Sequence, residues 1–448
     1  MITDIKVDGF RSLLNFSAEL HPGVNIVVGP NGSGKTNFIE FLNFAAKIVS
    51  DGVNAAISHT EGAGSTFSRE AFGRETATLD FSISGVTTSS FTPSNKHDLS
   101  GVLLDYQWSC KIVYDRRIPA IYIASETVKF TFEGKRPFIL RRSTSRSEAL
   151  KSARINLNAA RHPILKDSLS FRSSREKSDG SEHVLPDRFY VIDSGTSIFS
   201  KLYENFYFSD IAFSDITSLK SINIDPAIAR RPSSVTSKGE ILSNGSGLAG
   251  VLYRLRRGDP ILITFLADRD RDQTKAIFSS IVSWCREINP SIEDIDVSLD
   301  FTEALLKPNL LYCDGDKRTN YPFSRLSDGT VKWIALTTML FAQSTYATIE
   351  EPENFLHPLM QVTFIKLCRE LSARSVNKIQ MVISTHSLTI LDQCTPDELM
   401  LFENIEGATI CSRVANADSL NKKLDESRFG LGYLYRSGVV YGTHDSDR

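Results

Sequence analysis

The sequence predicts an α/β protein with a parallel core sheet, an antiparallel β subdomain and a helical insertion lobe. Three observations support this fold class. The apolar run 24–28 leads directly into a glycine-rich loop and an amphipathic helix, as in a strand–loop–helix unit. Alternating stretches rich in Tyr, Ile, Val and Phe between residues 77 and 132 predict antiparallel strands. Helical periods then dominate between Tyr190 and Lys307.

The composition is that of a soluble globular protein with an ample core. The chain has 448 residues, of which 41% are hydrophobic and 23% charged, and its length suggests about three domains. It has neither a long apolar run nor a signal-peptide pattern, so we expect a cytoplasmic protein without a membrane partner. The six cysteines show no metal-ligand spacing, which argues against a zinc site and suits a reducing compartment. The net charge of −2 does not indicate nucleic-acid binding by itself.

Two short strands joined by a hairpin open the chain. Apolar residues alternate loosely in the first strand and strictly in the second, and a turn follows at 21–23. We expect this hairpin to lead into the strand at 24–28. The alternating residues are Ile2, Ile5 and Val7 in the first strand and Phe16, Ala18 and Leu20 in the second.

The glycine-rich loop from Gly29 to Thr36 fits the pattern G-x-x-x-x-G-K-[ST]. The backbone N–H groups of such a loop converge on phosphate oxygens, Lys35 would neutralise the β- and γ-phosphates, and the Thr36 hydroxyl would bind Mg²⁺. The alternative is a glycine-rich turn before an ordinary helix. The strand before the loop and the amphipathic helix at 37–48 favour a nucleotide site. Its expected residues are Asn31, Gly32, Ser33, Gly34, Lys35, Thr36 and Asn37.

Three further strands are expected at 77–83, 104–114 and 120–132. The segment 135–177 that follows contains twelve Lys and Arg residues but only three Asp and Glu residues. It is either a solvated, serine-rich insertion or a surface for a phosphate backbone or an acidic partner. A platform that binds single strands would need aromatic residues between the charges, and this segment has few of them.

The middle of the chain predicts helices and loops. Helical spacing is found around residues 261–266 and again around 277–285. A loop is expected at 230–234, and a glycine-rich turn at 243–247 precedes a helix that starts near Leu248.

Ser327 and Asp328 lie just before an apolar helix that starts near Val331. This pair predicts a capped helix N-terminus whose N–H groups and positive dipole end point outward, where they can hold an anion. The alternative is an ordinary N-cap without a ligand.

An apolar strand at 346–350 ends in two adjacent carboxylates. Successive side chains of a strand point in opposite directions. We therefore assign Glu350 to Mg²⁺ and Glu351 to a water molecule in line with the γ-phosphate, as general base. An exposed acidic turn is the alternative.

A second buried-type strand at 379–384 precedes His386. A histidine at the carboxyl edge of a parallel sheet is well placed to contact a ligand, here the γ-phosphate. Otherwise it is a polar surface residue.

In this order, the motifs resemble those of the ATP-binding-cassette (ABC) ATPases. Leu326 to Gly329 matches the signature motif and His386 the switch histidine. The resemblance is closest to the RecF/SMC/OLD-like branch of AAA-type ATPases, as stand-alone proteins of the kind found in antiphage defence systems. The segments that carry this closer likeness are 9–12, 349–358 and 431–438, and in the middle of the chain only 244–249.

The resemblance implies an ABC-ATPase head, a P-loop NTPase fold, divided at residues 134 and 310. The segment 1–134 would be the N-terminal half of the head, 135–310 the basic and helical insertion lobe, and 311–448 the C-terminal half. One residue departs from the family pattern, and the position of another family residue stays open. Glu350 stands where many cassette ATPases have Asp, and the glutamine that links the two lobes has only Gln107 as a candidate.

The resemblance also implies a mechanism. ATP and Mg²⁺ would be bound, with Arg11 joining the nucleotide site, and two ATP molecules would be buried in a head-to-tail homodimer or a higher homo-oligomer. Ser327 and Gly329 of one subunit would contact the γ-phosphate held by another. Hydrolysis would then open the interface.

Two functions of different classes stay open. In the first, the chain is a sensor or scaffold that controls a separate effector, a nuclease or toxin, in bacterial antiphage defence. In the second, it is a RecF-like DNA-repair ATPase, and the basic segment 135–177 suits either. Prolines interrupt any long coiled coil of the SMC type. The residues after His386 are too few for the Toprim nuclease domain of OLD proteins, so the effector is expected on another chain.

Overall fold

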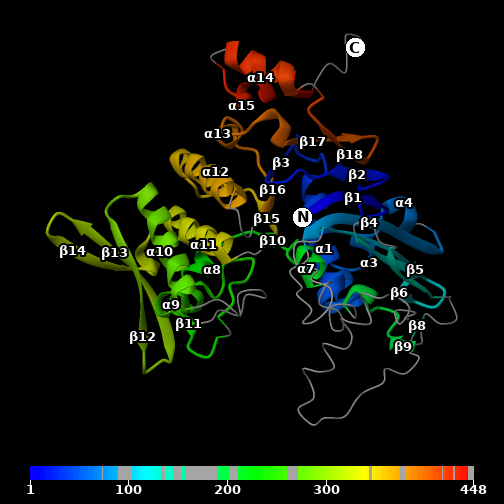
Figure 1. Cartoon of the computed structure of the whole chain (residues 1–448), viewed down its shortest axis with the longest axis horizontal. Coiled ribbons are helices and arrows are strands. Elements are labelled where there is room, and N and C mark those ends of the chain that lie inside the picture. Colours follow the sequence, from blue (N-terminus) through cyan, green and yellow to red (C-terminus); the bar gives the residue numbers. More distant parts are fainter. Residues whose placement is uncertain are drawn as a thin grey trace. The chain divides into compact units, whose positions relative to one another are not determined.

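The computed structural model divides the chain into two compact units, each made of several stretches (Figure 1). Unit 1 comprises Met1–His21, Pro30–Lys220 and Phe402–Ser412, and unit 2 comprises Pro22–Gly29, Ser221–Leu401 and Arg413–Arg448. The expected division at residues 134 and 310 stays a prediction. The structure describes residues 1–72, 74–88, 103–132, 137–144, 153–156, 189–200, 210–237, 239–259, 271–342, 346–373, 379–415, 417–426 and 429–441.

Unit 1 is built on a six-stranded antiparallel sheet with the order β2-β1-β4-β5-β6-β7. The opening hairpin and the three strands expected up to residue 132 are confirmed. The long phosphate-loop helix, α1 (Lys35–Asp51), has ten buried residues. The strands are β1 (Ile2–Asp8), β2 (Phe16–Glu19), β4 (Thr76–Thr88), β5 (Leu103–Asp115), β6 (Ala120–Phe132) and β7 (Phe138–Ser143).

A chain of aromatic rings joins α1 to this sheet. The ring of Phe41 lies 5.6 Å from that of Phe10 and 5.4 Å from that of Phe81. Phe81 in turn packs edge-on against Trp108 at 4.9 Å. Edge-to-face pairs of this kind add to the hydrophobic effect of burial, so they stabilise the packing of α1 on the sheet. Short helices, α2 (Val53–His59), α3 (Ala63–Thr66), α4 (Arg69–Phe72) and α7 (Asp210–Thr217), and the strand pair β8 (Ala153–Asn156) and β9 (Phe189–Ile192) complete the described part of unit 1.

Unit 2 contains the predicted parallel core sheet, which confirms the α/β fold class. Its strand order is β10-β15-β16-β3-β17, and each neighbouring pair is parallel. The central strands are apolar and buried along their length, as expected for a sheet covered on both faces. The strands are β3 (Val24–Val28), β10 (Ser221–Ile222), β15 (Tyr346–Glu350), β16 (Gln380–Ser384) and β17 (Leu399–Ile405). From Phe402 on, β17 belongs to unit 1, where it pairs with β18 (Ala408–Arg413).

The strand order brings distant parts of the sequence to one edge. Because the strands are parallel, their carboxyl ends lie on the same side of the sheet. Gly29, the first residue of the glycine loop, therefore leaves β3 at the edge where β15 ends at Glu350 and β16 ends just before Thr385. The amide of Thr385 donates a hydrogen bond to the carbonyl of Val27 at 3.2 Å, which fixes this alignment.

A second, antiparallel sheet in unit 2 corrects one expectation. Helix was expected through Lys307, but Ile292–Asp300 forms strand β12, which pairs with β13 (Leu305–Asp314). The register shifts between Ile292 and Asp294, so Ile292 and Ile295 are both buried three positions apart, a spacing that imitates a helix. The hairpin β13–β14 (Lys317–Pro322) and the short β11 (Ser233–Ser234) extend this sheet.

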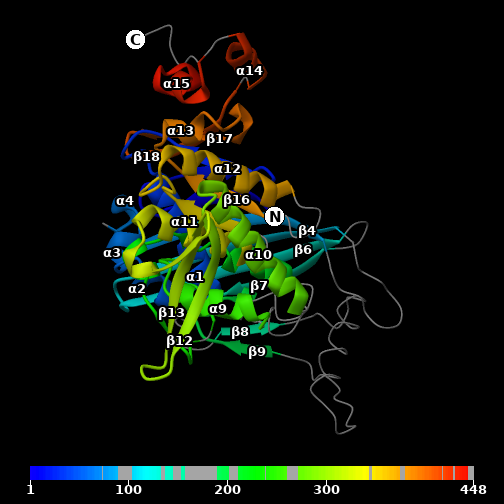
Figure 2. The ribbon, with the colours of Figure 1, turned by 90° about the vertical axis from the view of Figure 1, so that its left-hand side faces the viewer.

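The predicted helices of unit 2 are largely confirmed. Helix α9 (Leu248–Arg257) starts where the sequence indicated, and α10 (Arg271–Ile288) buries the expected apolar face; both lie beside β12 (Figure 2). The apolar pattern at 261–266 lies outside the described residues. The remaining helices are α8 (Pro226–Ala229), α11 (Asp328–Ala342), α12 (Pro358–Ala373), α13 (Leu388–Leu391), α14 (Ala417–Glu426) and α15 (Leu431–Arg436), with single 3₁₀ turns at Phe323–Arg325, Pro396–Glu398 and Val439–Tyr441.

The six cysteines are free thiols, and four of them are buried. Burial raises the pKa of Cys285 to about 12, so this thiol is protonated and unreactive at neutral pH. Of the helices that the structure describes, none combines the length and the apolar character needed to cross a bilayer.

Candidate active site

The glycine loop needs its glycines for two separate reasons. Gly32 and Gly34 have φ angles of 80° and 95°, in the left-handed region that side chains disfavour. In addition, a Cβ atom at Gly34 would lie 1.9 Å from the Oγ1 atom of Thr409 and 2.7 Å from its methyl carbon. No other residue fits at this position without moving the strand that carries Thr409.

Two polar side chains of the loop, those of Ser33 and Lys35, are buried. Lys35 is 7% exposed, and its Nζ atom donates to the carbonyl of Pro30 at 2.9 Å. The Ser33 hydroxyl is buried and has no hydrogen-bond partner among the described residues. Thr36, the expected Mg²⁺ ligand, is exposed at the first turn of α1. A cationic side chain and an unsatisfied hydroxyl beside a helix N-terminus suit a phosphate group.

A small hydrogen-bond network supports the loop from behind. The Asn37 side-chain amide donates to the Ser12 hydroxyl at 2.6 Å, and the hydroxyls of Ser12 and Thr409 lie 2.7 Å apart. The Thr409 backbone amide also donates to the Ser12 carbonyl at 2.8 Å. Nothing in the local sequence pattern predicts that Ser12 and Thr409, almost 400 positions apart, meet here.

Arg11 lies next to this network and is occupied by protein groups. Its guanidinium pairs with Glu40 of α1, and its Nε atom donates to the Ser65 carbonyl at 2.8 Å. A longer contact of 3.5 Å joins its Nη1 atom to Asn37. Burial lowers the pKa of Arg11, although the arginine stays charged at physiological pH. These contacts hold α1, and a direct nucleotide contact of Arg11 stays a prediction.

In unit 2, Glu350 closes β15 in an environment that suits a cation. Burial, and next the negative charge of Glu351, raise the pKa of the Glu350 carboxyl. The Asn223 side chain opposes this rise, with its amide donating to Oε2 at 3.3 Å. A divalent cation would remove this electrostatic cost, and carboxylate oxygens are the ligands that Mg²⁺ prefers. The donor chemistry of Glu350 therefore fits the metal expected from the sequence.

Glu351 begins a tight turn with an uncommon backbone conformation. Its φ angle is 40°, and its amide donates to the Ser384 carbonyl at 3.0 Å. The Asn354 side-chain amide donates to the Glu351 Oε2 atom at 3.0 Å. The turn thus ties the backbone of Glu351 to β16 and its carboxylate to Asn354. Such local strain persists only where the surrounding contacts hold it.

His386 faces this turn from the loop after β16. Its Nε2 atom lies 3.8 Å from the Glu351 Oε1 atom, beyond hydrogen-bond distance, and both side chains are about half exposed. The His386 backbone amide donates to the Glu353 Oε1 atom at 2.7 Å. The two predicted catalytic residues are thus close neighbours in unit 2, and Glu353, which the sequence analysis left unassigned, orders the histidine loop.

The predicted cap at the start of α11 is confirmed. The Ser327 hydroxyl accepts a hydrogen bond from the Thr330 amide at 3.2 Å, and Ser327 itself is exposed. A Cβ atom at Gly329 would lie 2.7 Å from the Phe355 carbonyl, so only glycine allows α11 to approach the turn that follows Glu351. Whether Ser327 and Gly329 contact a nucleotide stays a prediction.

Arg230 shapes the loop before α11. Its guanidinium donates to the carbonyls of Phe323, Ser324 and Leu326 at 3.5, 3.4 and 3.2 Å and pairs with the Asp328 carboxylate. From sequence, Arg230 was interpreted only as part of a loop. A long-range contact between a side chain and the backbone leaves no trace in the local pattern, so it could not have been predicted.

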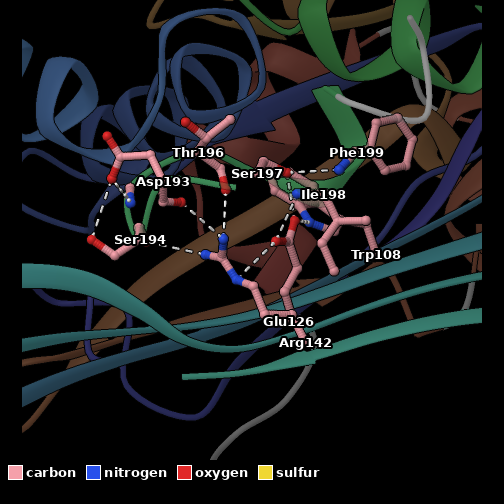
Figure 3. A network of polar contacts seen from close by, with 10 residues as sticks. Trp108, Glu126, Arg142, Asp193, Ser194, Thr196, Ser197, Ile198 and Phe199 are labelled. Carbon is pink, nitrogen blue, oxygen red and sulfur yellow. Dashed lines mark hydrogen bonds and ion pairs between the residues drawn. The ribbon is translucent and has the colours of Figure 1, made fainter. Parts of the chain in front are cut away.

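One arginine of the basic segment 135–177 has a structural role (Figure 3). Arg142 is buried on β7, lies 4.0 Å from the Glu126 carboxylate, and donates to the carbonyls of Asp193, Ser194 and Thr196 at 2.8 to 3.2 Å. Burial lowers its pKa, opposed by the charge of Glu126. The expectation that this segment offers its basic residues to DNA is therefore wrong for Arg142. Most of the others lie outside the described residues.

Glu126 completes the same network from β6. It accepts hydrogen bonds from the Trp108 indole at 2.9 Å and the Ile198 amide at 2.9 Å, and it also contacts the Ser197 hydroxyl. A buried charge is tolerated only when it is paired and hydrogen-bonded. The network thus fixes the segment 193–199 against the sheet of unit 1 (Figure 3).

The remaining candidate, Gln107, lies in the middle of β5. Its side-chain amide donates to the Ser82 hydroxyl at 3.1 Å, across the antiparallel sheet. By contrast, Asn223 follows the edge strand β10 directly and contacts Glu350. Within unit 2, Asn223 is therefore the amide side chain that lies beside the predicted metal ligand.

Comparisons with known proteins agree with these motifs. The sequence model of a family described as "AAA domain, putative AbiEii toxin, Type IV TA system" matches residues 24–392. The DNA replication and repair proteins RecF of Corynebacterium jeikeium and Streptomyces avermitilis are 37% and 39% identical to the chain over 54 residues. This segment is 12% of the chain and covers only 13% and 14% of the length of the two RecF proteins.

Two solved Smc head domains align with most of the chain at low sequence identity. The SmcHead bound to the C-winged helix domain of ScpA is 12% identical, with a TM-score of 0.47, over 93% of this chain and 99% of that one. The Smc head with an extended coiled coil, bound to the C-terminal domain of ScpA from Pyrococcus furiosus, is 13% identical, with a TM-score of 0.44, over 96% of this chain and 99% of that one.

Proposed function

Since the chain belongs to the AAA-domain family whose model matches residues 24–392, we propose that it binds ATP with Mg²⁺ and hydrolyses the ATP to ADP and phosphate. The observation that carries this proposal is the cluster at the carboxyl edge of the parallel sheet in unit 2. There a half-buried carboxylate (Glu350), a second carboxylate (Glu351) and a histidine (His386) lie at or just after the ends of two neighbouring strands. This is the chemistry that phosphoryl transfer to water requires.

The residues of the chain have distinct roles in this reaction. The backbone amides from Asn31 to Thr36 and the Lys35 ammonium bind the phosphates. Thr36 and Glu350 are the proposed ligands of Mg²⁺, which supplies charge neutralisation on the β- and γ-phosphates when it is bound. Glu351 accepts a proton from the attacking water as general base, and His386 contacts the γ-phosphate.

We further propose that ATP assembles the chain into a head-to-tail homodimer or a larger homo-oligomer. The capped start of α11 supports this proposal, because Ser327 is exposed and the helix N-terminus carries a partial positive charge. Ser327 and Gly329 of one subunit would bind the γ-phosphate held by the next. Assembly would then depend on the γ-phosphate and end with hydrolysis.

The biological role that we propose is control of a separate effector, a nuclease or toxin, in antiphage defence. The family description names the domain itself a "putative AbiEii toxin" of a type IV TA system, so it supports the two-component part of this proposal and not the separate effector. In this proposal the ATP-bound oligomer is the scaffold that holds or releases the effector. The effector and the trigger are different molecules from this chain.

The alternative is a RecF-like ATPase of DNA repair that binds duplex DNA directly. The observation in its favour is the 54-residue similarity to two RecF proteins. The burial of Arg142 removes one of the twelve basic residues that such a role could use.

One experiment tests both proposals. Native mass and ATP turnover are measured for the wild type and Glu351→Gln, with and without ATP and duplex DNA. Loss of the base should reduce turnover about 100-fold or more and leave an ATP-bound assembly that does not dissociate. Equal turnover in both proteins would contradict the role of Glu351. Assembly that ignores DNA supports the scaffold, whereas salt-dependent DNA binding that stimulates turnover supports the RecF-like alternative.

A further inference from the structure

Lys332 is a buried cation inside α11, one turn after the signature residues. It is 2% exposed, and its Nζ atom donates to the backbone carbonyl of Glu351 at 3.4 Å. The same atom lies 5.7 Å from the centre of the Phe355 ring. A lysine is rarely buried unless it is paired, so its position between α11 and the Glu351 turn requires an explanation.

The charges that face Lys332 come from the turn itself. Glu353 is the larger and Glu351 the smaller electrostatic influence that stabilises its protonated form, against the cost of burial. Glu353 uses its Oε1 atom to accept from the His386 amide at 2.7 Å. Its Oε2 atom is buried and has no hydrogen-bond partner among the described residues. Lys332 is a cation that interacts electrostatically with this carboxylate, and no direct ion pair joins the two side chains among the described residues.

These contacts join three separate segments of unit 2. Lys332 connects α11 to the carbonyl of Glu351, and Glu353 connects the same turn to the loop that carries His386. Gly329 brings α11 close enough, since a Cβ atom there would meet the Phe355 carbonyl at 2.7 Å. The signature helix, the base and the histidine are therefore linked by polar contacts that do not involve a nucleotide.

We propose that Lys332 and Glu353 are positioning residues that couple the start of α11 to Glu351 and His386. This inference rests on the proposed ATPase function and adds its regulation. When Ser327 binds the nucleotide of another subunit, α11 is fixed, and Lys332 then fixes the turn that aims Glu351. Hydrolysis in a subunit thereby depends on assembly. Without Lys332, Glu351 would still be present but would no longer respond to the state of α11.

The first test does not depend on catalysis. Hydrogen exchange of the amides between Glu351 and Phe355 is measured on nucleotide-free protein for the wild type, Lys332→Met and Lys332→Arg. Lys366→Met, at an exposed lysine of α12, is the control. Loss of a hydrogen bond from a charged group should speed exchange in this turn about tenfold in Lys332→Met only, with partial recovery in Lys332→Arg. Unchanged exchange in Lys332→Met would overturn the proposal.

The second test measures ATP turnover against protein concentration for the same variants. In the wild type, turnover per subunit should rise steeply with assembly. In Lys332→Met, kcat should fall about tenfold, KM for ATP should stay within about twofold, and the dependence on assembly should be lost. Equal kcat in the wild type and Lys332→Met would contradict the coupling. An inactive wild type would contradict the proposed function, while the exchange experiment would still decide the role of Lys332.

Variants of Glu353 distinguish the two polar links, the one between Lys332 and the Glu351 turn and the one between Glu353 and the His386 amide. Glu353→Gln keeps an oxygen for the His386 amide but removes the charge that faces Lys332, whereas Glu353→Ala removes both. Faster exchange at His386 is expected in the alanine variant alone, and faster exchange in the 351–355 turn is expected in both. A Glu353→Ala protein with wild-type exchange at both places would contradict the proposal.

Discussion

The phosphate loop in unit 1 and the acidic edge in unit 2 are built in different ways. Within unit 1 the loop is a continuous stretch from Pro30 to Thr36, and its shape follows from Gly32 and Gly34 at positive φ. The acidic edge is made by the ends of two strands and a helix start, which polar contacts hold in position. A site made of consecutive residues depends mainly on those residues. A site made of segments that are distant in the sequence also depends on the residues that hold those segments together. Substitutions of supporting residues should therefore act differently in the two units.

The largest effect is expected from Gly34→Ala in the loop. The left-handed conformation costs about 1–2 kcal/mol for alanine, and the overlap with Thr409 adds about 1–3 kcal/mol. The free energy of unfolding should fall by about 2–5 kcal/mol, and ATP affinity should fall about 100-fold as the amides lose their alignment. Denaturant unfolding and titration with a fluorescent ATP analogue measure the two effects.

Gly407→Ala is the matched control. Gly407 has a similar φ angle of 86°, but nothing lies within 4 Å of the position of its Cβ atom. This variant should pay only the conformational cost of about 1–2 kcal/mol and keep its ATP affinity. If both alanine variants bind ATP equally well, the loop does not depend on the close approach of Thr409, and the contrast between the two units is lost.

The same difference explains what the sequence could and could not predict. The glycine loop, the acidic strand end and the capped start of α11 have local patterns, and the structure places a strand or helix where each was expected. Ser12, Asn223, Arg230 and Lys332 have no such pattern, because their partners lie far away in the chain. Strand β12 was missed although Ile295, Val297 and Leu299 alternate as in a strand, because the irregularity between Ile292 and Asp294 interrupts that alternation at its start.

The next largest effect is expected from Arg230→Ala in unit 2. This change removes donors from three carbonyls and from Asp328, so the loop that presents Ser327 should lose its shape. Hydrogen bonds to a charged group contribute about 1.5–3 kcal/mol, so ATP-dependent assembly should weaken at least tenfold. ATP binding by the single subunit should stay as in the wild type, unlike in Gly34→Ala. Sedimentation with and without ATP measures the assembly.

Arg231→Ala is the control for charge, because Arg231 is the exposed neighbour of Arg230. It should assemble as the wild type does. If the two alanine variants assemble equally well, Arg230 has no special role in presenting Ser327.

A smaller effect is expected from Asn223→Ala. The Asn223 amide is the group that offsets the raised pKa of Glu350, through one contact of 3.3 Å. Loss of a single hydrogen bond of about 1 kcal/mol should raise the Mg²⁺ concentration for half-maximal turnover about fivefold. ATP affinity without metal should not change, which a binding titration in a chelator checks. Equal Mg²⁺ requirements in both proteins would show that Asn223 does not support the metal ligand.

The smallest effect concerns Lys332 and pH. Burial lowers its pKa to about 8, against the opposing charges of Glu353 and Glu351. Above this pH the folded protein releases the proton, while the unfolded chain keeps it up to the ordinary lysine pKa of about 10.4. The unfolded state then binds more protons, so this lysine makes the free energy of unfolding rise with pH in that window. Below about pH 8 both states are protonated, and the full cost of burying the charge remains.

Comparison with Lys332→Met isolates this contribution, because titrating thiols and tyrosines affect both proteins equally. From about pH 7.5 to about pH 9.5, the free energy of unfolding of the wild type should gain about 1 kcal/mol relative to the variant, after allowance for solvent screening. Urea unfolding at the two pH values measures the difference. A constant difference would mean that Lys332 is not charged and buried against the Glu351 turn. In that case the acidic edge of unit 2 would depend on its own motif residues alone.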